Sequence, residues 1–449
     1  MEHIIKGGSV TQTETDYGYL PGFENSHSTE AAEGALPIGR NNPQKPPLGL
    51  YAEEMSGTAF TAPRMTNRRS WTYRIRPSVK HGTGFKLYDH PYVRTAPCRN
   101  ETDLPPMQLR WMPIEIPDTP TDFLDGLRTI TTCGDAWTQT GMASHVYVAN
   151  QSMSNKYFMN ADGEMLLLPQ EGAIRMITEF GIIIAGPGEI IVLPRGVKFR
   201  VELLDDRCRG YICENYGSIF TLPERGPIGS NHLANQRDFL YPVAAYEDLE
   251  GSFELHMKWQ GTFSKTMLTH SPLDVVAWHG NYAPYKYDLK RFAVMGSISF
   301  DHPDPSIFTV LTSASSQAGV ANVDFVIFPE RWLVMEDTFR PPWYHMNAMS
   351  EFMGLLYGMY DAKPGPGGFV PGGMSLHNAF LPHGPDAEAW TKATNKKLEP
   401  EKLSNTMAFM FESRYVQTPT AFASEEPRID MDYVSCWDTL ESHFEPEEK

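Results

Sequence analysis

The chain has 449 residues, of which 41% are hydrophobic and 12% aromatic, a globular composition with enough material for two or three domains. Its formal net charge of -17 argues against a nucleic-acid or anionic-membrane partner, because both require a basic surface. With 36 glycines and 36 prolines, we expect frequent turns and many short strands, and therefore a mainly β fold.

The first residues contain no apolar segment of the secretory type, and no run approaches the roughly 18 apolar residues of a membrane span. The five cysteines are an odd number without a C-x-x-C pair: Cys98, Cys133, Cys208, Cys213 and Cys436. This usage favours reduced thiols over a disulfide framework. We therefore expect a cytoplasmic protein without a membrane partner.

Residues 1–67 are rich in Gly, Pro, Asn and Glu and show little periodicity. They predict a loop-rich N-terminal arm that wraps its own or a neighbouring subunit. The arginine-rich run from Arg64 to Lys80 follows the arm. Alternation within Trp71–Arg76 favours a strand with one solvated face, or a contact between subunits, over a nucleic-acid site. Between Pro97 and Pro120, recurring prolines predict an extended connection.

From Val146 to Tyr211, apolar runs alternate with Gly/Pro turns, as in Pro187–Val201. This pattern predicts short strands and resembles a cupin half-barrel. Metal-binding cupins have the motif Pro-x-Gly-x-x-His, whereas this chain has Pro194-Arg-Gly196-Val-Lys-Phe199. Asn160-Ala-Asp162 also stands where a His-x-His pair is expected. We predict a retained scaffold that holds no metal.

Apolar runs return after Phe292, so we place a domain boundary near Lys290. The expected architecture is two cupin-like, jelly-roll β-barrel halves. Residues 1–289 form the N-terminal β-rich domain with the vestigial barrel, and residues 290–449 form the catalytic, metal-binding domain. Residues 387–397 are the best helix candidate of the second half, polar and on the surface.

Three histidines and one carboxylate share the segment from Arg340 to Asp386, and these are metal-binding side chains. Glu351 follows His345 by six positions, which places the two side chains on different faces of a helix. On a straight strand, six steps would separate them by about 20 Å, too far for one metal. The chain must therefore bend between them, and Asn347 and Ser350 are suitable turn residues.

A third ligand from the later segment, which contains His377 and His383, would complete a triad of two imidazoles and one carboxylate. Such a triad leaves coordination positions open and favours non-haem iron(II). Spacing alone does not separate His377 from His383, because both lie in one loop flanked by Pro and Gly.

Several strings are similar to the homogentisate 1,2-dioxygenase family. In the second half they are Arg340-Pro-Pro-Trp-Tyr-His345, Ser350-Glu-Phe-Met-Gly354, Ser375-Leu-His377, Pro382-His-Gly-Pro-Asp386 and Met407-Ala-Phe-Met-Phe-Glu412. Upstream they are Asn41-Asn-Pro-Gln44, Leu50-Tyr-Ala-Glu53, Ser56-Gly-Thr-Ala-Phe60 and Gly226-Pro-Ile-Gly-Ser-Asn231. The resemblance extends from about Tyr19 to Glu412 and covers nearly the whole chain.

The resemblance implies an Fe(II) enzyme that opens the ring of homogentisate with dioxygen to give 4-maleylacetoacetate, in tyrosine and phenylalanine catabolism. It implies His345, Glu351 and His383 as metal ligands. It further implies that Tyr360, His377 and His383 face the substrate, that His302 is the acid/base, and that the protein is a homo-hexamer, a dimer of trimers. Tyr357 and Met359 depart from the basic side chains expected there, which puts the lining of the pocket beside Tyr360 in doubt.

Two other classes of protein remain open. A zinc- or manganese-dependent cupin isomerase could use the same ligands, and a requirement for iron(II) with consumption of dioxygen would exclude it. A non-catalytic binding protein built from two cupins would lack ligands in both halves, whereas here only the first half lacks them.

Overall fold

The computed structural model describes residues 18–82, 84–98, 104–224, 226, 233–301, 304–363, 368–425 and 428–446. The expected mainly β fold is confirmed, because strands form most of the regular structure. The α-helices among these residues are short, α1 (Ala387–Asn395) and α2 (Ala421–Ser424). Brief 3-10 helices are η2 (Pro47–Gly49), η4 (Gln236–Asp238), η5 (Leu289–Arg291), η6 (Pro305–Phe308) and η7 (Tyr433–Trp437).

Two large sheets build the N-terminal half. The nine-stranded sheet has the order β1 (Tyr19–Pro21), β16 (Phe239–Pro242), β20 (Tyr285–Asp288), β13 (Glu189–Leu193), β10 (Glu164–Glu171), β15 (Cys208–Asn215), β8 (Thr140–Ala149), β7 (Leu127–Asp135), β28 (Thr418–Pro419). The seven-stranded sheet has the order β12 (Gly181–Ala185), β11 (Ile174–Thr178), β14 (Lys198–Leu203), β9 (Lys156–Asn160), β17 (Glu250–Trp259), β18 (Thr262–His270), β5 (Lys86–Tyr88).

Three smaller sheets complete the fold. The six-stranded sheet of the C-terminal half has the order β21 (Thr309–Ala314), β22 (Ala321–Phe328), β27 (Met407–Ser413), β24 (Ser350–Tyr357), β25 (Met374–His377), β6 (Leu109–Trp111). The four-stranded sheet has the order β2 (His27–Glu30), β19 (Val275–Gly280), β4 (Arg69–Arg74), β3 (Tyr51–Ser56), and a two-stranded sheet pairs β23 (Arg331–Leu333) with β26 (Glu401–Leu403). Each sheet is open in its strand order, so facing sheets form sandwiches of the jelly-roll kind.

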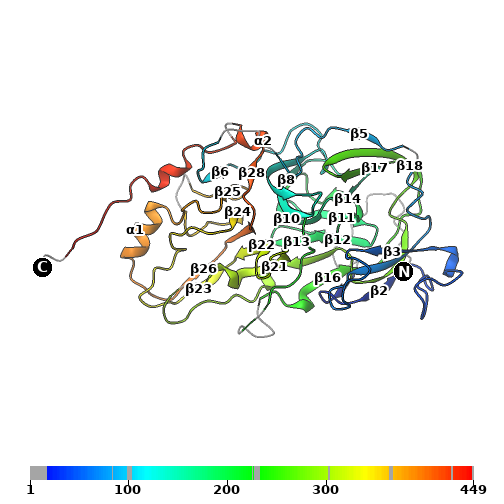
Figure 1. The fold of residues 1–449 in the computed structure, drawn as a ribbon, viewed down its shortest axis with the longest axis horizontal. Coiled ribbons are helices and arrows are strands. Elements are labelled where there is room, and N and C mark those ends of the chain that lie inside the picture. The colour runs from blue at the N-terminus through cyan, green and yellow to red at the C-terminus, as the bar shows by residue number, and fades with distance from the viewer. Residues whose placement is uncertain are drawn as a thin grey trace.

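The nine-stranded sheet is the central layer, with the C-terminal half on one side of it in Figure 1. Met165 and Leu167 of β10 join the apolar core shared with the seven-stranded sheet, whereas Leu166 and Leu168 join the core shared with the six-stranded sheet. Tyr211 of β15 packs on Phe409 of β27, with ring centroids 4.8 Å apart. Because both faces are buried, β10 is a continuous apolar run without alternation.

The two halves exchange edge strands. β6 comes from the proline-rich connection, yet it pairs with β25 in the C-terminal sheet, with Arg110 opposite Ser375. β28 comes from the C-terminal segment, yet it pairs with β7, with Thr418 opposite Thr132. The Trp111 indole of β6 is buried and donates to the Ala423 carbonyl at 2.7 Å. The predicted extended connection is therefore part of the sheet that carries the candidate site.

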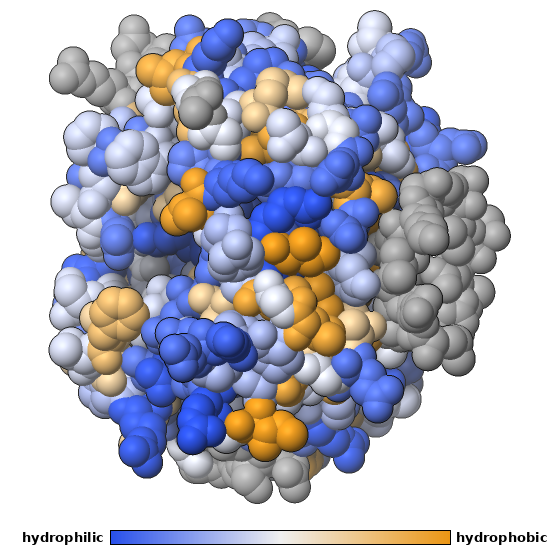
Figure 2. Space-filling view, turned by 90° about the vertical axis from the view of Figure 1, so that its right-hand side faces the viewer, coloured by the Kyte–Doolittle hydropathy of each residue, from blue (hydrophilic) through white to orange (hydrophobic). Residues whose placement is uncertain are grey.

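The N-terminal arm has few regular elements, as expected. Its strands β1, β2 and β3 each pair with a strand of the same chain, so the arm wraps its own domain. Apolar side chains of the arm such as Ile38, Phe60 and Met65 are exposed. Figure 2 shows the face of the N-terminal half, on which apolar groups lie among polar ones. The arm therefore leaves apolar surface uncovered.

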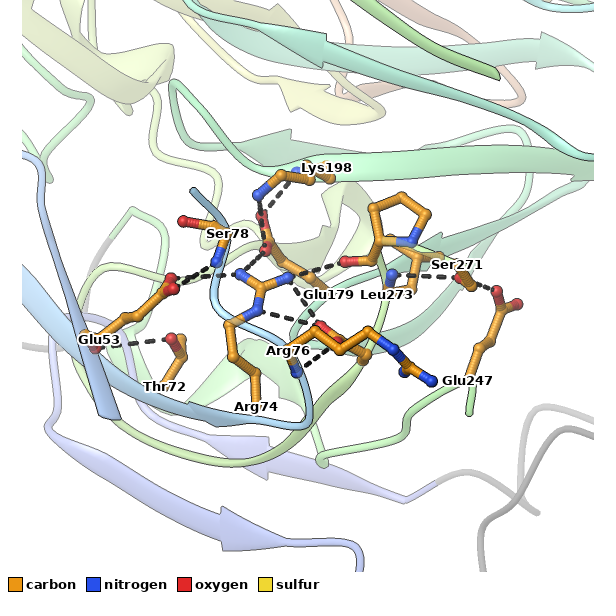
Figure 3. A network of polar contacts seen from close by, with 12 residues as sticks. Glu53, Thr72, Arg74, Arg76, Ser78, Glu179, Lys198, Glu247, Ser271 and Leu273 are labelled. Carbon is orange, nitrogen blue, oxygen red and sulfur yellow. Dashed lines mark hydrogen bonds and ion pairs between the residues drawn. The ribbon is translucent and has the colours of Figure 1, made fainter. Parts of the chain in front are cut away.

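The interpretation of Trp71–Arg76 as a strand with one solvated face is wrong at Arg74. Arg74 is buried on β4, and its guanidinium contacts Glu179 at 3.1 Å and Asp274 at 2.9 Å (Figure 3). Lys198 also contacts Glu179, at 3.2 Å. Although burial works against it, the cations Lys198 and Arg74 lower the pKa of Glu179. Ion pairs with carboxylates from two distant loops, which alternation does not reveal, hold this arginine inside the protein.

The helix predicted at residues 387–397 is confirmed as α1. Its N-cap is Asp386, whose side chain accepts a hydrogen bond from the Ala389 amide at 2.7 Å. α1 has nine residues, and within the described part of the chain no helix is long and apolar enough to cross a membrane.

The ammonium group of Lys258 is buried among polar side chains inside the N-terminal half. Lys258 Nζ lies 3.0 Å from Asp162 and 2.5 Å from Glu214, and Glu214 also accepts from Asn160 at 2.6 Å. His145 Nε2 lies 3.0 Å from the second oxygen of Glu214. Burial would raise the pKa of Glu214, but Lys258 and His145 hold it well below its ordinary value. Asp162 thus pairs with an internal cation, and Asn160 binds the second carboxylate that contacts it.

Phe199, which replaces the expected ligand, lies in an aromatic core. Its ring centroid is 5.6 Å from that of Phe158 and 6.1 Å from that of Phe123. A phenyl ring in these surroundings offers no ligand atom, and the metal-free N-terminal half stays a prediction.

Candidate metal centre

His345 and His383 face each other across an isolated antiparallel bridge. The His345 amide donates to the His383 carbonyl at 2.9 Å, and the His383 amide donates to the His345 carbonyl at 3.0 Å. This reciprocal pair brings together two imidazoles that are 38 positions apart in the sequence, with ring centroids 4.2 Å apart. This backbone pairing therefore holds the two candidate ligands next to each other.

Glu351 lies at the start of β24, after the bend that the spacing predicts. Asn347 forms this bend, because its side-chain oxygen accepts from the Met349 amide at 3.0 Å, and β24 begins at Ser350. Glu351 Oε1 lies 3.5 Å from His345 Nε2, and Oε2 lies 3.2 Å from His383 Nε2. The fold therefore brings these three side chains together.

The three side chains fit a metal ion. One ligand atom from each lies within 4.8 Å of the others. Ligand atoms about 2.1 Å from one metal and at right angles to each other are about 3 Å apart, close to the separations seen here. His345 Nδ1 contacts the Trp343 carbonyl at 2.8 Å, and His383 Nδ1 contacts the Leu381 carbonyl at 2.9 Å. Because a carbonyl only accepts, each Nδ1 carries the proton and each Nε2 lone pair is free to coordinate.

The electrostatics of the site favour an ionised carboxylate. Burial would raise the pKa of Glu351, but its contacts with His345 and His383 hold it well below the ordinary value. The contact with Glu351 raises the pKa of His345. Glu412, on the neighbouring strand β27, differs, because burial and the Glu351 charge raise its pKa to about 7.

His377 lies behind His383 and does not join the triad. Its ring stacks on that of His383, with centroids 4.2 Å apart and planes 11° apart, and its Nε2 lies 2.8 Å from the Tyr433 hydroxyl. Lys363 donates to the same hydroxyl, so the Tyr433 proton is directed at His377 Nε2. His377 Nδ1 then carries a proton, and it is buried without a partner among the described residues.

A cavity of about 430 Å³ opens onto the triad. Its walls include His345, Glu351, His383, His377 and Tyr360, as well as Asp304, Pro305, Ser306, Phe308, Phe328, Arg331, Trp343, Lys363, Met410 and Glu412. Neither Tyr357 nor Met359 is among the described residues that line this cavity. Met359 is exposed, and Tyr357 lies beside Gly188.

His302 lies outside the described residues. The segment that follows it, Asp304 to Ser306, lines the cavity.

The sequence analysis missed the cluster of Lys363 and Tyr433. Lys363 is buried, lies over the Tyr433 ring at 4.6 Å, and has its pKa lowered to about 8 by burial. Tyr433 comes from η7, 70 positions along the chain. Nothing in the sequence around Lys363 indicated a role in the site, because only the tertiary fold brings Tyr433 of η7 next to it.

Comparison with known proteins gives one family for the whole chain. The models for the homogentisate 1,2-dioxygenase N-terminal and C-terminal regions match residues 18–289 and 290–444. The homogentisate 1,2-dioxygenase of Rhodopseudomonas palustris (strain BisB18) is 61% identical over 98% of this chain and 97% of its own length. Those of Nitrobacter hamburgensis and Bradyrhizobium diazoefficiens are each 62% identical over 96% of this chain and 95% of their own lengths.

Solved structures align less closely. A mutant of Bacillus subtilis oxalate decarboxylase covers 76% of this chain and 81% of its own, at 12% identity and a TM-score of 0.28. Protein Ylba from E. coli covers 71% and 95%, at 9% identity and a TM-score of 0.30. The sequence relatives decide the assignment: the chain belongs to the homogentisate 1,2-dioxygenase family.

Proposed function

We propose that this protein is a ring-cleaving dioxygenase that converts homogentisate and dioxygen to 4-maleylacetoacetate, in tyrosine and phenylalanine catabolism. The observation that carries the proposal is the convergence of His345, Glu351 and His383 in the wall of one cavity. Relatives named homogentisate 1,2-dioxygenase, at about 62% identity over nearly the full length, support the same activity.

We infer that the metal is Fe(II), held by His345, Glu351 and His383. Two neutral imidazoles and one carboxylate leave a divalent ion with net positive charge and open coordination positions. Bound Fe(II) supplies the redox chemistry that allows triplet dioxygen to react with an aromatic ring, which zinc does not. The protein's part is to fix the ligand atoms, exclude water and handle protons.

The cavity walls supply groups that fit the substrate. Homogentisate carries a carboxylate, and two buried cations line the cavity: Arg331, which pairs with Asp361, and Lys363, which contacts the Tyr433 hydroxyl. The Tyr360 hydroxyl has no hydrogen-bond partner within the described part of the chain and lies in the wall, and burial raises its pKa well above the ordinary range. Tyr360 therefore stays protonated and can donate to a substrate oxygen, as can His377 Nδ1. The ring of His383 also borders this space.

The proposal assigns acid/base catalysis to His302. Histidine has an unperturbed pKa near neutrality, so it can take the proton from a substrate phenol and return one later. We expect His302→Phe to keep its metal and fold but to lose turnover by roughly 10²- to 10⁴-fold. Steady-state oxygen uptake and metal content would be measured together, with the exposed His81→Phe as a matched control. Near-normal turnover in His302→Phe would leave the base unidentified.

The activity is tested by loading the protein with Fe(II) without oxygen, adding homogentisate, and following dioxygen with an electrode. We expect consumption of one dioxygen per homogentisate and formation of the ring-opened product, and none with Zn²⁺ or Mn²⁺. Activity with zinc or manganese and no uptake of dioxygen would favour a cupin isomerase. Binding of homogentisate without turnover under all three metals would favour a binding protein.

Metal content distinguishes one site from two. Because Phe199 and Asn160-Ala-Asp162 stand where the N-terminal half would need ligands, and Lys258 already pairs with Asp162, we expect about one iron per chain after removal of loosely bound metal. Elemental analysis against protein concentration measures this ratio. Two per chain would contradict a metal-free N-terminal half.

We infer that residues 1–289 are the scaffold domain and that residues 290–449 carry catalysis, because the cavity residues lie between Asp304 and Glu412. The five cysteines form no disulfide within the described part of the chain, and reduced thiols support a cytoplasmic location. The exposed apolar side chains of the arm support assembly into a homo-hexamer, a dimer of trimers. Sedimentation of the intact protein would measure the number of chains.

A further inference from the structure

A second layer of polar groups lies next to Glu351. The Asn347 amide nitrogen donates to Glu351 Oε1 at 3.2 Å and to Glu412 Oε1 at 2.5 Å. The Asn347 oxygen accepts from the Met349 amide at 3.0 Å. This last contact fixes the orientation of the amide, because a flipped amide would place its oxygen against two carboxylates and its NH₂ against a backbone N–H. Both N–H groups of Asn347 are therefore used, one for each carboxylate.

The two carboxylates that Asn347 bridges sit on adjacent strands. Glu351 on β24 is directly opposite Glu412 on β27 in the antiparallel register, and both line the cavity. Like charges directly opposite each other destabilise a sheet unless a donor or cation lies between them. Asn347 supplies the donor on one side, and the imidazoles of His345 and His383 face Glu351 on the other.

We propose that Asn347 and Glu412 are positioning residues that hold the Glu351 carboxylate in its metal-binding orientation. Glu412 anchors the Asn347 amide, and the amide holds Glu351 Oε1, which fixes the carboxylate plane and directs Oε2 toward His383. Groups that orient a ligand in this way affect metal affinity nearly as strongly as they affect activity. This inference rests on the proposed role of Glu351 as a metal ligand.

The decisive variant is Asn347→Asp. Aspartate keeps the oxygen that accepts from Met349, so the bend is retained, but it replaces both donors with an oxygen that repels the two carboxylates. We expect Fe(II) affinity, measured by competition with a chelator, to fall roughly 10- to 100-fold. The visible spectrum of the Co(II)-loaded protein should change as well, because the position of a ligand changes. If Asn347 served only to form the bend, neither the Fe(II) affinity nor the Co(II) spectrum would change.

Glu412→Gln separates hydrogen bonding from charge. Glutamine keeps an oxygen that accepts from Asn347, so we expect metal affinity close to that of the unaltered protein, whereas Glu412→Leu removes the anchor and should weaken it. In the Asn347→Asp background, Glu412→Gln removes one repelling charge and should restore part of the lost affinity. Asn395→Asp, at the exposed end of α1, controls for the added negative charge and should change nothing.

Glu351→Ala is measured in parallel. If Glu351→Ala loses the metal while Asn347→Asp keeps unchanged Fe(II) affinity and an unchanged Co(II) spectrum, the positioning role is wrong and the ligand set stands. If Glu351→Ala retains the metal at full affinity, the ligand set itself is wrong. A fall in Asn347→Asp affinity, with partial recovery through Glu412→Gln, supports the positioning role.

Discussion

His383→Ala is expected to leave a folded protein that retains no metal and consumes no dioxygen. The His383 imidazole presents Nε2 to Glu351 at 3.2 Å while its Nδ1 proton is held by the Leu381 carbonyl, so its replacement removes one of three donors. The loss should exceed the roughly 10- to 100-fold change in affinity that follows from altering residues around a ligand. Metal content after gel filtration and oxygen uptake would be measured on the same sample, with the melting temperature as a test of folding.

His377→Ala is the matched control, because it removes the same side chain six positions away. His377 stacks on His383 and bonds to Tyr433 rather than to Glu351, so this variant should keep its metal and lose turnover. The opposite pattern, with the metal lost from His377→Ala and kept in His383→Ala, would show that the two histidines exchange roles.

Lys258→Ala should cost about 3–5 kcal/mol in free energy of unfolding. The substitution removes the ammonium between Asp162 and Glu214 and leaves two carboxylates buried without their cation. His145 and Asn160 still contact Glu214, but only His145 can supply a charge. Urea denaturation followed by circular dichroism measures the change.

Lys265→Ala is the comparison for this variant. Lys265 contacts Glu254 at 3.0 Å on the neighbouring strand, but both side chains are partly exposed, so its removal should cost less than about 1 kcal/mol. Asp162→Asn and Glu214→Gln, added to Lys258→Ala, should recover much of the stability, because they remove the unpaired charges. Equal losses in Lys258→Ala and Lys265→Ala would contradict the role of Lys258 as an internal cation.

Local patterns predicted the strands and the helix well. The alternating and apolar runs of 146–211 are strands, and Asp386 caps α1 where the polar helix was expected. Partners distant in sequence were not predictable. Arg74 is buried because it pairs with Glu179 and Asp274, which lie in two loops distant in sequence, and Lys258 is internal because it pairs with Asp162 and Glu214. Such pairings depend on tertiary contacts that a single chain pattern does not encode.

The candidate site was likewise predicted only in part from the sequence. The bend at Asn347 followed from the distance that six residues span, and the structure has it. The choice of His383 over His377 could not follow from spacing, because it depends on a two-residue backbone bridge to His345. The bridging role of Asn347 between Glu351 and Glu412 was missed too, since Glu412 reaches the site only through the register of β24 and β27.

The exchange of β6 and β28 bears on the order in which a newly made chain can fold. As the polypeptide leaves the ribosome, β6 emerges long before β25, the strand with which it pairs. The edge of β7 likewise waits for β28, which is near the end of synthesis. The edge of β6 therefore stays unpaired until residues 374–377 have been made, and the edge of β7 until residues 418–419 have been made. A chain that ended before residue 418 would lack β28 and would leave the edge of β7 in the N-terminal half unpaired, so the N-terminal scaffold depends on the C-terminal end of its own chain.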